Sequence, residues 1–306
     1  VSVSSGATIS ADASKLTGDT ISGAGTVAIT NLQSTLAADF TNITATTVNA
    51  TWASGTGTYT GNLTNVDSLS ISSGTMTVSD NILGTLDTSG AGSITVLVDS
   101  SSSQDFANLS LSGTETIKFT GDSTFTGNFQ NSSVTIDTGV TVTTDASIVS
   151  GKTVSGTGIL SVTNLDATLS ASFANVNPTT LNVDWSGTGT QTYTGNLTNV
   201  DTLTVTSGTM QVDANILNVA TTITNSSTIS ITNLEVVPSM NLTKITGGTV
   251  NADWSGDATF TGNLSSANLT VSSGTMTVTT GTIAGSGTVS VSSGATISAD
   301  ASKLTG

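Results

Sequence analysis

The stretch VSVSSGATISADASKLTG fills residues 1–18, and the same letters return without a change at residues 289–306. The chain therefore contains a long repeat with a period of 288 positions, from Val1 to Val289, and restarts that repeat at its own end. Self-similarity at a fixed period is typical of stacked repeat architectures. We expect residues 1–306 to be one continuous solenoid, a window onto a longer tandem array in which Val1 is internal. A chain designed with overlapping ends would give the same pattern.

A shorter unit recurs inside the long repeat. The motif [YF]-T-G-N starts at Tyr59, Phe125, Tyr193 and Phe260, so successive copies are 66, 68 and 67 positions apart. An aromatic residue precedes each copy by 6 to 8 positions: Trp52, Phe119, Trp185 and Trp254. T-N-L triplets containing Asn31, Asn164 and Asn233 each place their Asn 21 positions before a Trp. These marks predict sub-repeats at approximately 26–90, 91–157, 158–225 and 226–288, with a surface turn where the spacing after the aromatic varies.

Within each sub-repeat the sequence has the alternating pattern of short strands. Alternating runs rich in β-branched residues are bounded by Gly, Ser, Asn and Asp, as in TISADAS (8–14), TVNATW (47–52) and SITVLV (93–98). Such runs predict strands, and many lie roughly 18–25 residues apart, the length of one solenoid rung. Ser, Thr, Val, Asn and Gly form helices poorly. The one helical signal is DASKLTG (12–18), a brief turn that Asp or Ser can cap and that Gly18 ends.

Two all-β architectures fit these strands: a solenoid, and a string of β-sandwiches that each cover one or two sub-repeats. Large aromatics usually fill a sandwich core, yet only 12 aromatic residues occur in 306. Only two prolines are present, and no Pro-rich linker separates the units. Ser and Thr contribute 111 residues, and their side chains suit ladders that repeat every ~4.8 Å along a stack. We therefore predict an all-β, parallel β-solenoid with short strands and rungs of roughly 18–25 residues.

Charge and composition exclude several functions. The net charge is −15, with five Lys, no Arg and no His, so the basic stripe that nucleic-acid binding needs is missing. The absence of His excludes catalytic triads and histidine acid–base chemistry, and the absence of Cys excludes disulfides and thiolate metal sites. No continuous apolar stretch approaches the length that a membrane-spanning helix needs. We therefore expect no transmembrane helix and no membrane insertion in this segment.

Three runs carry a resemblance to a known class of proteins: ISGAGTVAITNL (21–32), VSGTGILSVTNLDATLS (154–170) and LTVSSGTMTVTTGTIAGSGTVSVSSGATIS (269–298). They resemble the repeats of giant tandem-repeat secreted β-helix surface proteins, including haemagglutinin-like adhesins and autotransporter passenger regions. The resemblance covers essentially the whole chain and rests on strand–turn patterns. It implies a right-handed parallel β-helix outside the cell, used for attachment or as a structural filament.

Paired carboxylates are the remaining route to catalysis, because some β-helix proteins act on polysaccharides. The candidate residues are Asp184, Asp201, Asp213 and Asp253. Asp184 and Asp253 occupy equivalent places one residue before a Trp, where the first copy has Thr51. A single active site is not expected to be copied around a repeat. We therefore predict no enzyme and no catalytic, cofactor-binding or metal-binding residues.

Calcium binding has a weak signal. The G-x-G turns at Gly23–Gly25, Gly156–Gly158 and Gly285–Gly287 lack the Asp that a calcium-binding β-roll requires. Three G-D turns remain, at Gly18–Asp19, Gly121–Asp122 and Gly256–Asp257. Asp is common in turns because it bonds the local backbone, so we expect no cofactor beyond weak surface Ca²⁺ at acidic turns.

Other surface features have two interpretations each. Threonine pairs could form an ice-binding face, but the pairs beside [YF] recur once per sub-repeat and not once per rung. Among the many T-x-T pairs are Thr58/Thr60, Thr124/Thr126, Thr192/Thr194, Thr259/Thr261 and Thr275/Thr277. Ten N-x-[ST] sequons, among them Asn62, Asn108, Asn196 and Asn263, are close to the number that chance provides. Trp52, Trp185, Trp254, Tyr59 and Tyr193 could stack on sugars if exposed, but their fixed spacing favours packing. We expect the five lysines, including the equivalent Lys15 and Lys303, to be solvated.

These observations predict an acidic, extracellular, cell-surface structural protein. It would form a rod, filament, sheath or surface layer by stacking and self-association, with other copies of itself and cell-surface glycans as partners. The alternative is an adhesin stalk that projects a distal binding domain. An ice-binding solenoid and a polysaccharide-active β-helix enzyme are the more remote alternatives.

Overall fold

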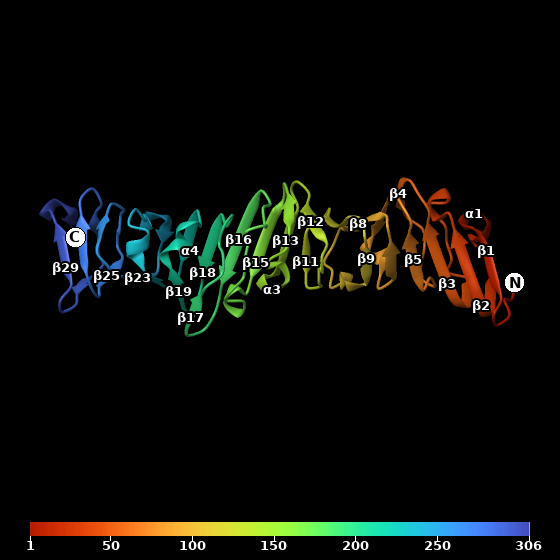
Figure 1. Cartoon of the computed structure of the whole chain (residues 1–306), viewed down its shortest axis with the longest axis horizontal. Coiled ribbons are helices and arrows are strands. Elements are labelled where there is room, and N and C mark those ends of the chain that lie inside the picture. The colour runs from red at the N-terminus through yellow and green to blue at the C-terminus, as the bar shows by residue number, and fades with distance from the viewer. Residues whose placement is uncertain (306) are drawn as a thin grey trace. The chain divides into compact units, whose positions relative to one another are not determined.

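The chain is mostly β: many short parallel strands form stacked parallel sheets, the arrangement of a parallel β-solenoid (Figure 1). The computed structural model describes residues 1–305. The chain packs as two compact units. Unit 1 comprises Val1–Val142 and Lys152–Gly158, and unit 2 comprises Thr143–Gly151 and the described residues from Ile159 onward.

Unit 1 is built on two six-stranded sheets. The first has the order β1 (Thr8–Asp12), β2 (Ile21–Thr30), β3 (Ile43–Trp52), β5 (Ser68–Ile71), β7 (Asp87–Gly90) and β9 (Leu109–Leu111). The second has the order β14 (Val154–Gly156), β12 (Ser133–Ile136), β10 (Glu115–Phe119), β8 (Ser93–Val98), β6 (Thr75–Ser79) and β4 (Thr56–Tyr59). The unit also contains β11 (Ser123–Phe125), and β13 (Thr141–Asp145) begins in it.

Unit 2 repeats this construction. One sheet contains β15 (Ile159–Thr163), β16 (Thr180–Trp185), β18 (Thr202–Val205), β20 (Thr222–Asn225) and β22 (Ile245–Thr246). A second contains β17 (Thr190–Tyr193), β19 (Thr209–Asp213), β21 (Thr228–Thr232), β23 (Thr249–Trp254), β25 (Asn268–Val271) and β28 (Val289–Val291). Two smaller sheets follow: β24 (Ala258–Phe260), β26 (Thr275–Val278) and β29 (Thr296–Ala299), then β27 (Ile283–Ala284) with β30 (Leu304–Thr305).

Strand pairing within each unit confirms the predicted rung. Paired residues lie between 17 positions apart, as for Thr116 and Ser133, and 22 positions apart, as for Ile21 and Ile43. Every one of these pairings is parallel and joins one turn of the chain to the next. Sandwich domains are made of antiparallel sheets, so the string-of-sandwiches alternative is wrong.

The inward faces form continuous apolar columns. In unit 2 one column runs through Val212, Ile231, Ala252 and Leu269, all buried. Because side chains alternate across a strand, the polar residues between them form outward ladders, such as Thr190, Thr209, Thr228 and Thr249. This confirms the predicted stacking of threonines and explains how a chain with few aromatics builds a core.

Helices are short and lie at the rung corners. The α-helices are α1 (Ala13–Leu16), α2 (Asp80–Leu83), α3 (Ala146–Val149) and α4 (Ala214–Asn218). The 3₁₀ turns are η1 (Leu32–Ser34), η2 (Phe106–Asn108), η3 (Leu165–Ala167), η4 (Leu234–Val236), η5 (Leu242–Lys244) and η6 (Ala301–Lys303). The predicted turn at 12–18 is confirmed: Asp12 caps α1 by accepting a hydrogen bond from the Ser14 N–H. None of the helices in residues 1–305 combines the length and apolar character needed to cross a membrane.

The sub-repeat does not stack on itself. Its equivalent aromatics Trp52, Phe119, Trp185 and Trp254 lie on β3, β10, β16 and β23, which belong to four different sheets. Strand pairs of successive rungs are offset by 17 to 22 positions and isolated bridges by up to 24, so a sub-repeat of 66 to 68 positions is not tied to a whole number of turns and its copies end on different sheets. Sub-repeat copies therefore do not form columns; consecutive rungs do.

Candidate functional site

An aspartate–asparagine contact recurs at the rung corners. Asp12 accepts from the Ser14 N–H at 2.9 Å through Oδ1, while Asn31 of the next rung donates Nδ2–H to Asp12 Oδ2 at 3.0 Å. The same contact joins Asp145 to Asn164 at 2.9 Å and Asp213 to Asn233 at 2.7 Å. We call this arrangement the corner clasp. It fixes a helix N-terminus and ties it to the following rung.

The asparagine of each clasp has an unusual backbone. Asn31, Asn164 and Asn233 have φ of 52°, 56° and 56° and stand directly before η1, η3 and η4. Asn enters this left-handed region more readily than most residues because its short polar side chain bonds locally. The T-N-L triplets of the sequence thus mark left-handed corners.

Hydrogen bonding favours the charged form of two clasp carboxylates, Asp12 and Asp145. The Ser14 backbone N–H, the Ser14 hydroxyl, Asn31 and Ser34 together hold the pKa of Asp12 well below its usual value. Burial acts to raise the pKa of Asp145, but hydrogen bonds from Ser147 and Asn164 outweigh it and lower that pKa. Donors aimed at a carboxylate favour its charged form.

The T-G-N motif marks a second type of corner, at which two rungs touch closely. The Tyr193 hydroxyl donates to the Ala171 carbonyl at 2.6 Å, and the Asn196 N–H donates to the same oxygen at 2.8 Å. A Cβ on Gly195 would lie 2.0 Å from that oxygen. Tyr59, Ala38 and Gly61 repeat the arrangement. The glycine is required because the neighbouring rung occupies the space of a side chain.

The repeated aromatics are buried, which confirms the packing interpretation. Trp52, Trp185, Trp254, Tyr59 and Tyr193 are essentially inaccessible to solvent, so none presents a face for stacking on a sugar ring. Burial strongly raises the pKa of the Tyr59 and Tyr193 phenols. In unit 1 the rings of Phe125 and Phe129 stack with centroids 4.3 Å apart. These residues therefore fill the core.

Two of the four candidate carboxylates bind neighbouring backbone. Asp201 accepts from the Leu181 N–H of the preceding rung at 2.8 Å, as Asp67 does from the Val48 N–H at 2.7 Å. Asp213 is the capping residue of a corner clasp and also accepts from the Asn215 N–H at 2.8 Å. Both carboxylates thus have local structural partners.

Asp184 and Asp253 lie on outward positions of β16 and β23, each beside an inward Trp. Burial, and then the charge of Asp166, raises the pKa of Asp184. Asp166 itself accepts from the Ser186 N–H at 3.1 Å, and Glu235 holds Ser255 in the same way, with 3.0 Å to its N–H. Asp166, the charged neighbour of Asp184, thus holds a corner. The structure does not bring the four candidate carboxylates together in one site.

Two of the three acidic turns bind backbone of the next rung. Asp122 accepts from the Thr141 N–H at 2.7 Å and Asp257 from the Thr275 N–H at 2.6 Å. Across residues 1–305 no group of three or more carboxylates is arranged to hold a metal ion. Weak surface Ca²⁺ binding stays a prediction.

The expectation that all five lysines are solvated is wrong for Lys244. Its ammonium donates to three carbonyls, those of Leu217, Asn218 and Ala220, at 3.1, 2.8 and 3.0 Å. Partial burial lowers its pKa. Lys244 lies one rung after the carbonyls that it binds, so spacing along the sequence does not reveal the contact.

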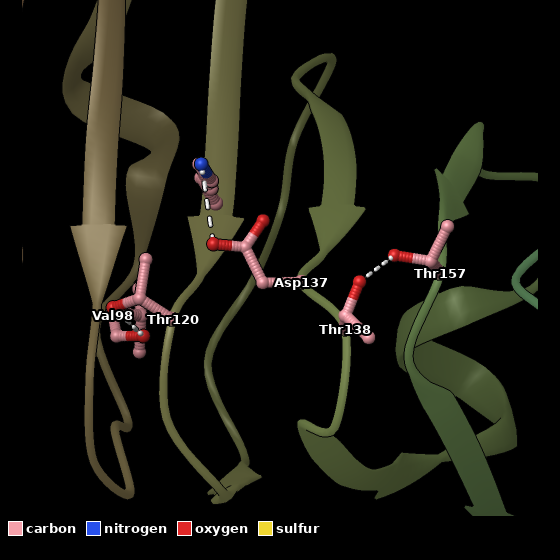
Figure 2. A network of polar contacts seen from close by, with 6 residues as sticks. Val98, Thr120, Asp137, Thr138 and Thr157 are labelled. Atoms are coloured by element: carbon pink, nitrogen blue, oxygen red, sulfur yellow. Dashed lines mark hydrogen bonds and ion pairs between the residues drawn. The ribbon is translucent and has the colours of Figure 1, made fainter.

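Outward side chains also join neighbouring rungs in unit 1 (Figure 2). Lys118 and Asp137 form an ion pair at 3.2 Å, and the hydroxyls of Thr138 and Thr157 lie 2.6 Å apart. Because the ion pair is well exposed, it adds little stability. The threonines expected for an ice-binding face, Thr58, Thr124, Thr192 and Thr259, lie on strands of different sheets and do not form one array.

The sequon asparagines of the T-G-N corners also have structural roles. The side-chain oxygens of Asn62, Asn196 and Asn263 accept from backbone N–H groups two residues on, at 2.8, 2.7 and 3.0 Å. Asn108 donates Nδ2–H to the Thr85 carbonyl at 2.6 Å. Each amide thus stabilises a corner in the unmodified chain.

The hollows of the surface do not coincide with the candidate carboxylates. A hollow of about 420 Å³ in unit 2 is lined mainly by apolar residues, among them Ile283, Val291 and Leu304. Two others, of about 360 and 220 Å³, are lined by uncharged residues around Asn241 and Asn196. The corner clasp was not predicted, although its signal is present in the sequence: an Asp precedes the Asn of the three T-N-L triplets by 19 or 20 positions.

Comparison of the chain with protein-family models, with characterised proteins and with solved structures finds no match.

Proposed function

We propose that this chain is a non-enzymatic structural protein of the cell exterior, which forms rods, filaments, sheaths or surface layers by rung stacking and self-association. One observation carries the proposal: side chains that could do chemistry are used to hold one rung to the next. The corner clasps of Asp12, Asp145 and Asp213 are the clearest case. A protein whose polar groups serve its own stacking is suited to extension.

The partners follow from the same features. Stacked rungs leave sheet edges at the ends of a solenoid, and exposed edges pair readily with another chain. Further copies of this chain are therefore its main partners, with cell-surface glycans as a second class. The net charge of −15 argues against nucleic acid and helps to keep a long polymer soluble.

Electron microscopy tests this proposal. An antibody raised against the purified chain is applied to intact cells that make it, and the released assemblies are viewed in negative stain. The proposal expects surface labelling and regular contacts between copies. Labelling confined to the cell interior contradicts it. Single projecting fibres with a non-repetitive tip would instead indicate an adhesin stalk.

A further inference from the structure

Hydroxyl-bearing residues of successive rungs lie above one another on one sheet of unit 1. Spacing along the sequence disfavoured an ice-binding face, because the threonine pairs beside [YF] recur once per sub-repeat. Strand pairing brings together a different set, with one pair from each rung. The pairs are Thr56/Thr58 on β4, Thr75/Thr77 on β6 and Ser93/Thr95 on β8, and Thr116 on β10 and Ser133 on β12 extend the second column. We call these eight residues the hydroxyl array.

The hydroxyl array is regular in two directions. Pairing from β4 to β12 proceeds without a register shift, so the second column is continuous through five strands. Neighbouring strands lie about 4.8 Å apart, and alternate residues along a strand lie about 6.6 Å apart. Because the β-branched side chain of threonine has few χ1 rotamers, its hydroxyl is held close to a fixed position. The array therefore presents oxygens on a two-dimensional lattice.

Frozen water has a similar spacing. When O–H···O bonds of about 2.75 Å join water molecules in tetrahedral order, oxygens bonded to a common neighbour lie about 4.5 Å apart, and the layers repeat after about 7.3 Å. The mismatch along a column is therefore about 0.3 Å for each rung. When the match is centred on the middle strand, the mismatch at either end of the five strands is about 0.6 Å. A small side-chain rotation can absorb this difference.

The threonine hydroxyls of the longer column are available to a ligand. Thr58 is exposed, and Thr77, Thr95 and Thr116 are partly exposed. Within residues 1–305 these four hydroxyls have no hydrogen-bond partner in the protein. The strands beneath them are held by buried inward residues such as Met76. The column thus combines free donors and acceptors with a fixed support.

The distribution of charge also favours an uncharged ligand. The six strands of this sheet, from β4 to β14, contain no aspartate, although the chain has 20 acidic residues. The one acidic residue on these strands, Glu115, accepts from the Leu111 N–H at 2.7 Å, and Lys118 beside the array pairs with Asp137. Charged side chains give up their hydration only at a large cost. A face without free charges can therefore approach an uncharged solid closely.

A threonine column in unit 2 lacks this second regular direction. Its members, on β17, β19, β21 and β23, are Thr190, Thr209, Thr228 and Thr249. The neighbouring column contains the longer side chains of Gln211 and Asn251, and the Thr192 hydroxyl donates to Gln211 Oε1 at 3.0 Å. Asp213 and Asp253 lie on the same strands. This column has the rung spacing without the two-dimensional pattern, so it provides a control within the same chain.

We propose that the hydroxyl array binds ice. Water oxygens at the ice surface complete the hydrogen bonds of the threonine hydroxyls, and the threonine methyl groups pack between those oxygens. Each contact is weak, but the array is rigid before binding, so little side-chain entropy is lost when several contacts form together. This function goes beyond the proposed structural role and does not depend on it.

Two matched substitutions in the full 306-residue chain test the inference. Thr77→Tyr places a ring over the middle of the hydroxyl array, and Thr228→Tyr makes the same change in the unit 2 column. Tyrosine is favoured in strands, so both variants should fold, which circular dichroism at 4 °C checks. The fraction of protein taken up by slowly growing ice is measured, with serum albumin as an excluded protein, together with thermal hysteresis. The unaltered chain and Thr228→Tyr should enter ice, and Thr77→Tyr should fall to the level of albumin and lose its hysteresis.

The other outcomes overturn the inference. If ice excludes the unaltered chain as it excludes albumin, the array does not bind ice. If both variants lose uptake equally, or neither does, the array is not the binding surface. Sedimentation velocity of the same proteins adds a further result: if Thr77→Tyr weakens association between copies and leaves uptake by ice unchanged, this face is a contact between copies instead. The proposed structural role is tested separately by surface labelling of cells, so it can stand when ice binding fails.

Discussion

Replacing Gly195 by alanine should expose how closely two rungs approach at a T-G-N corner. A Cβ at this position would lie 2.0 Å from the Ala171 carbonyl oxygen, whereas ordinary Cβ contacts begin near 3.4 Å. The corner must therefore open by more than one ångström before the contact becomes an ordinary one. That movement disrupts two hydrogen bonds to the Ala171 oxygen, from Tyr193 at 2.6 Å and from Asn196 at 2.8 Å.

The expected loss follows from these contacts. Each hydrogen bond contributes about 0.5–1.5 kcal/mol net, and forced overpacking costs about 1–3 kcal/mol. Because opening the corner relieves part of the overpacking, we expect Gly195→Ala to lower the free energy of unfolding by about 2–4 kcal/mol. Gly189 is the matched control. Its φ is 72° and nothing lies within 4 Å of its built Cβ, so Gly189→Ala carries only backbone strain of about 1–2 kcal/mol.

Urea denaturation of the two variants, followed by circular dichroism, measures the difference. Repeat proteins can unfold in segments, so hydrogen exchange of residues 171–200 locates the change. Gly195→Ala should accelerate exchange at Asn196, and Gly189→Ala should not. If the two variants lose equal stability and Asn196 stays protected, close rung contact is not the reason for glycine in the motif.

Three further changes test the corner contacts. Asn164→Ala removes the clasp donor to Asp145 and puts alanine at a left-handed position, and should lower the free energy of unfolding by about 2 kcal/mol at pH 7. The folded pKa of Asp145 is depressed, so its contribution to stability is present above the unfolded pKa of about 3.9 and disappears as the pH falls through the folded value. Urea titrations at pH 7 and pH 3 should therefore show a smaller loss of stability in the variant at pH 3. An equal loss at both pH values would contradict the clasp. Lys244→Met keeps the apolar stem but removes the donor to three carbonyls, and should cost about 1–2 kcal/mol; an unchanged thermal midpoint would show that water replaces the ammonium. Tyr193→Phe should cost only about 1 kcal/mol by urea denaturation, because Phe260 fills the equivalent place without a hydroxyl, and a loss as large as that of Gly195→Ala would contradict the expectation.

The alternating pattern of the sequence was enough to predict the direction of most side chains. Trp185 was expected inside from its fixed spacing and is buried, while Thr192 and Thr194, on either side of Tyr193, face outward. The rung length and the turn at Asp12 also followed from local pattern. These features depend on strand alternation and capping, which neighbouring residues determine.

Contacts between rungs could not be predicted in the same way. Lys244 was expected in solvent and instead binds the carbonyls of Leu217, Asn218 and Ala220. The migration of the sub-repeat from sheet to sheet arises because its length is not tied to a whole number of turns. Both features depend on which segments become neighbours after the chain has coiled.

Residues 1–18, which recur at 289–306, show most clearly which features the sequence determines and which it does not. By itself the sequence determined that VSVSSGATISADASKLTG forms a strand and a capped turn, and both copies do so. It could not determine that the apolar side of residues 1–18 is covered by the next rung, which leaves Val3 only 3% exposed. Only the tertiary structure decided this, because the apolar face of a rung leaves water when another rung covers it, and that partner lies outside the rung's own sequence.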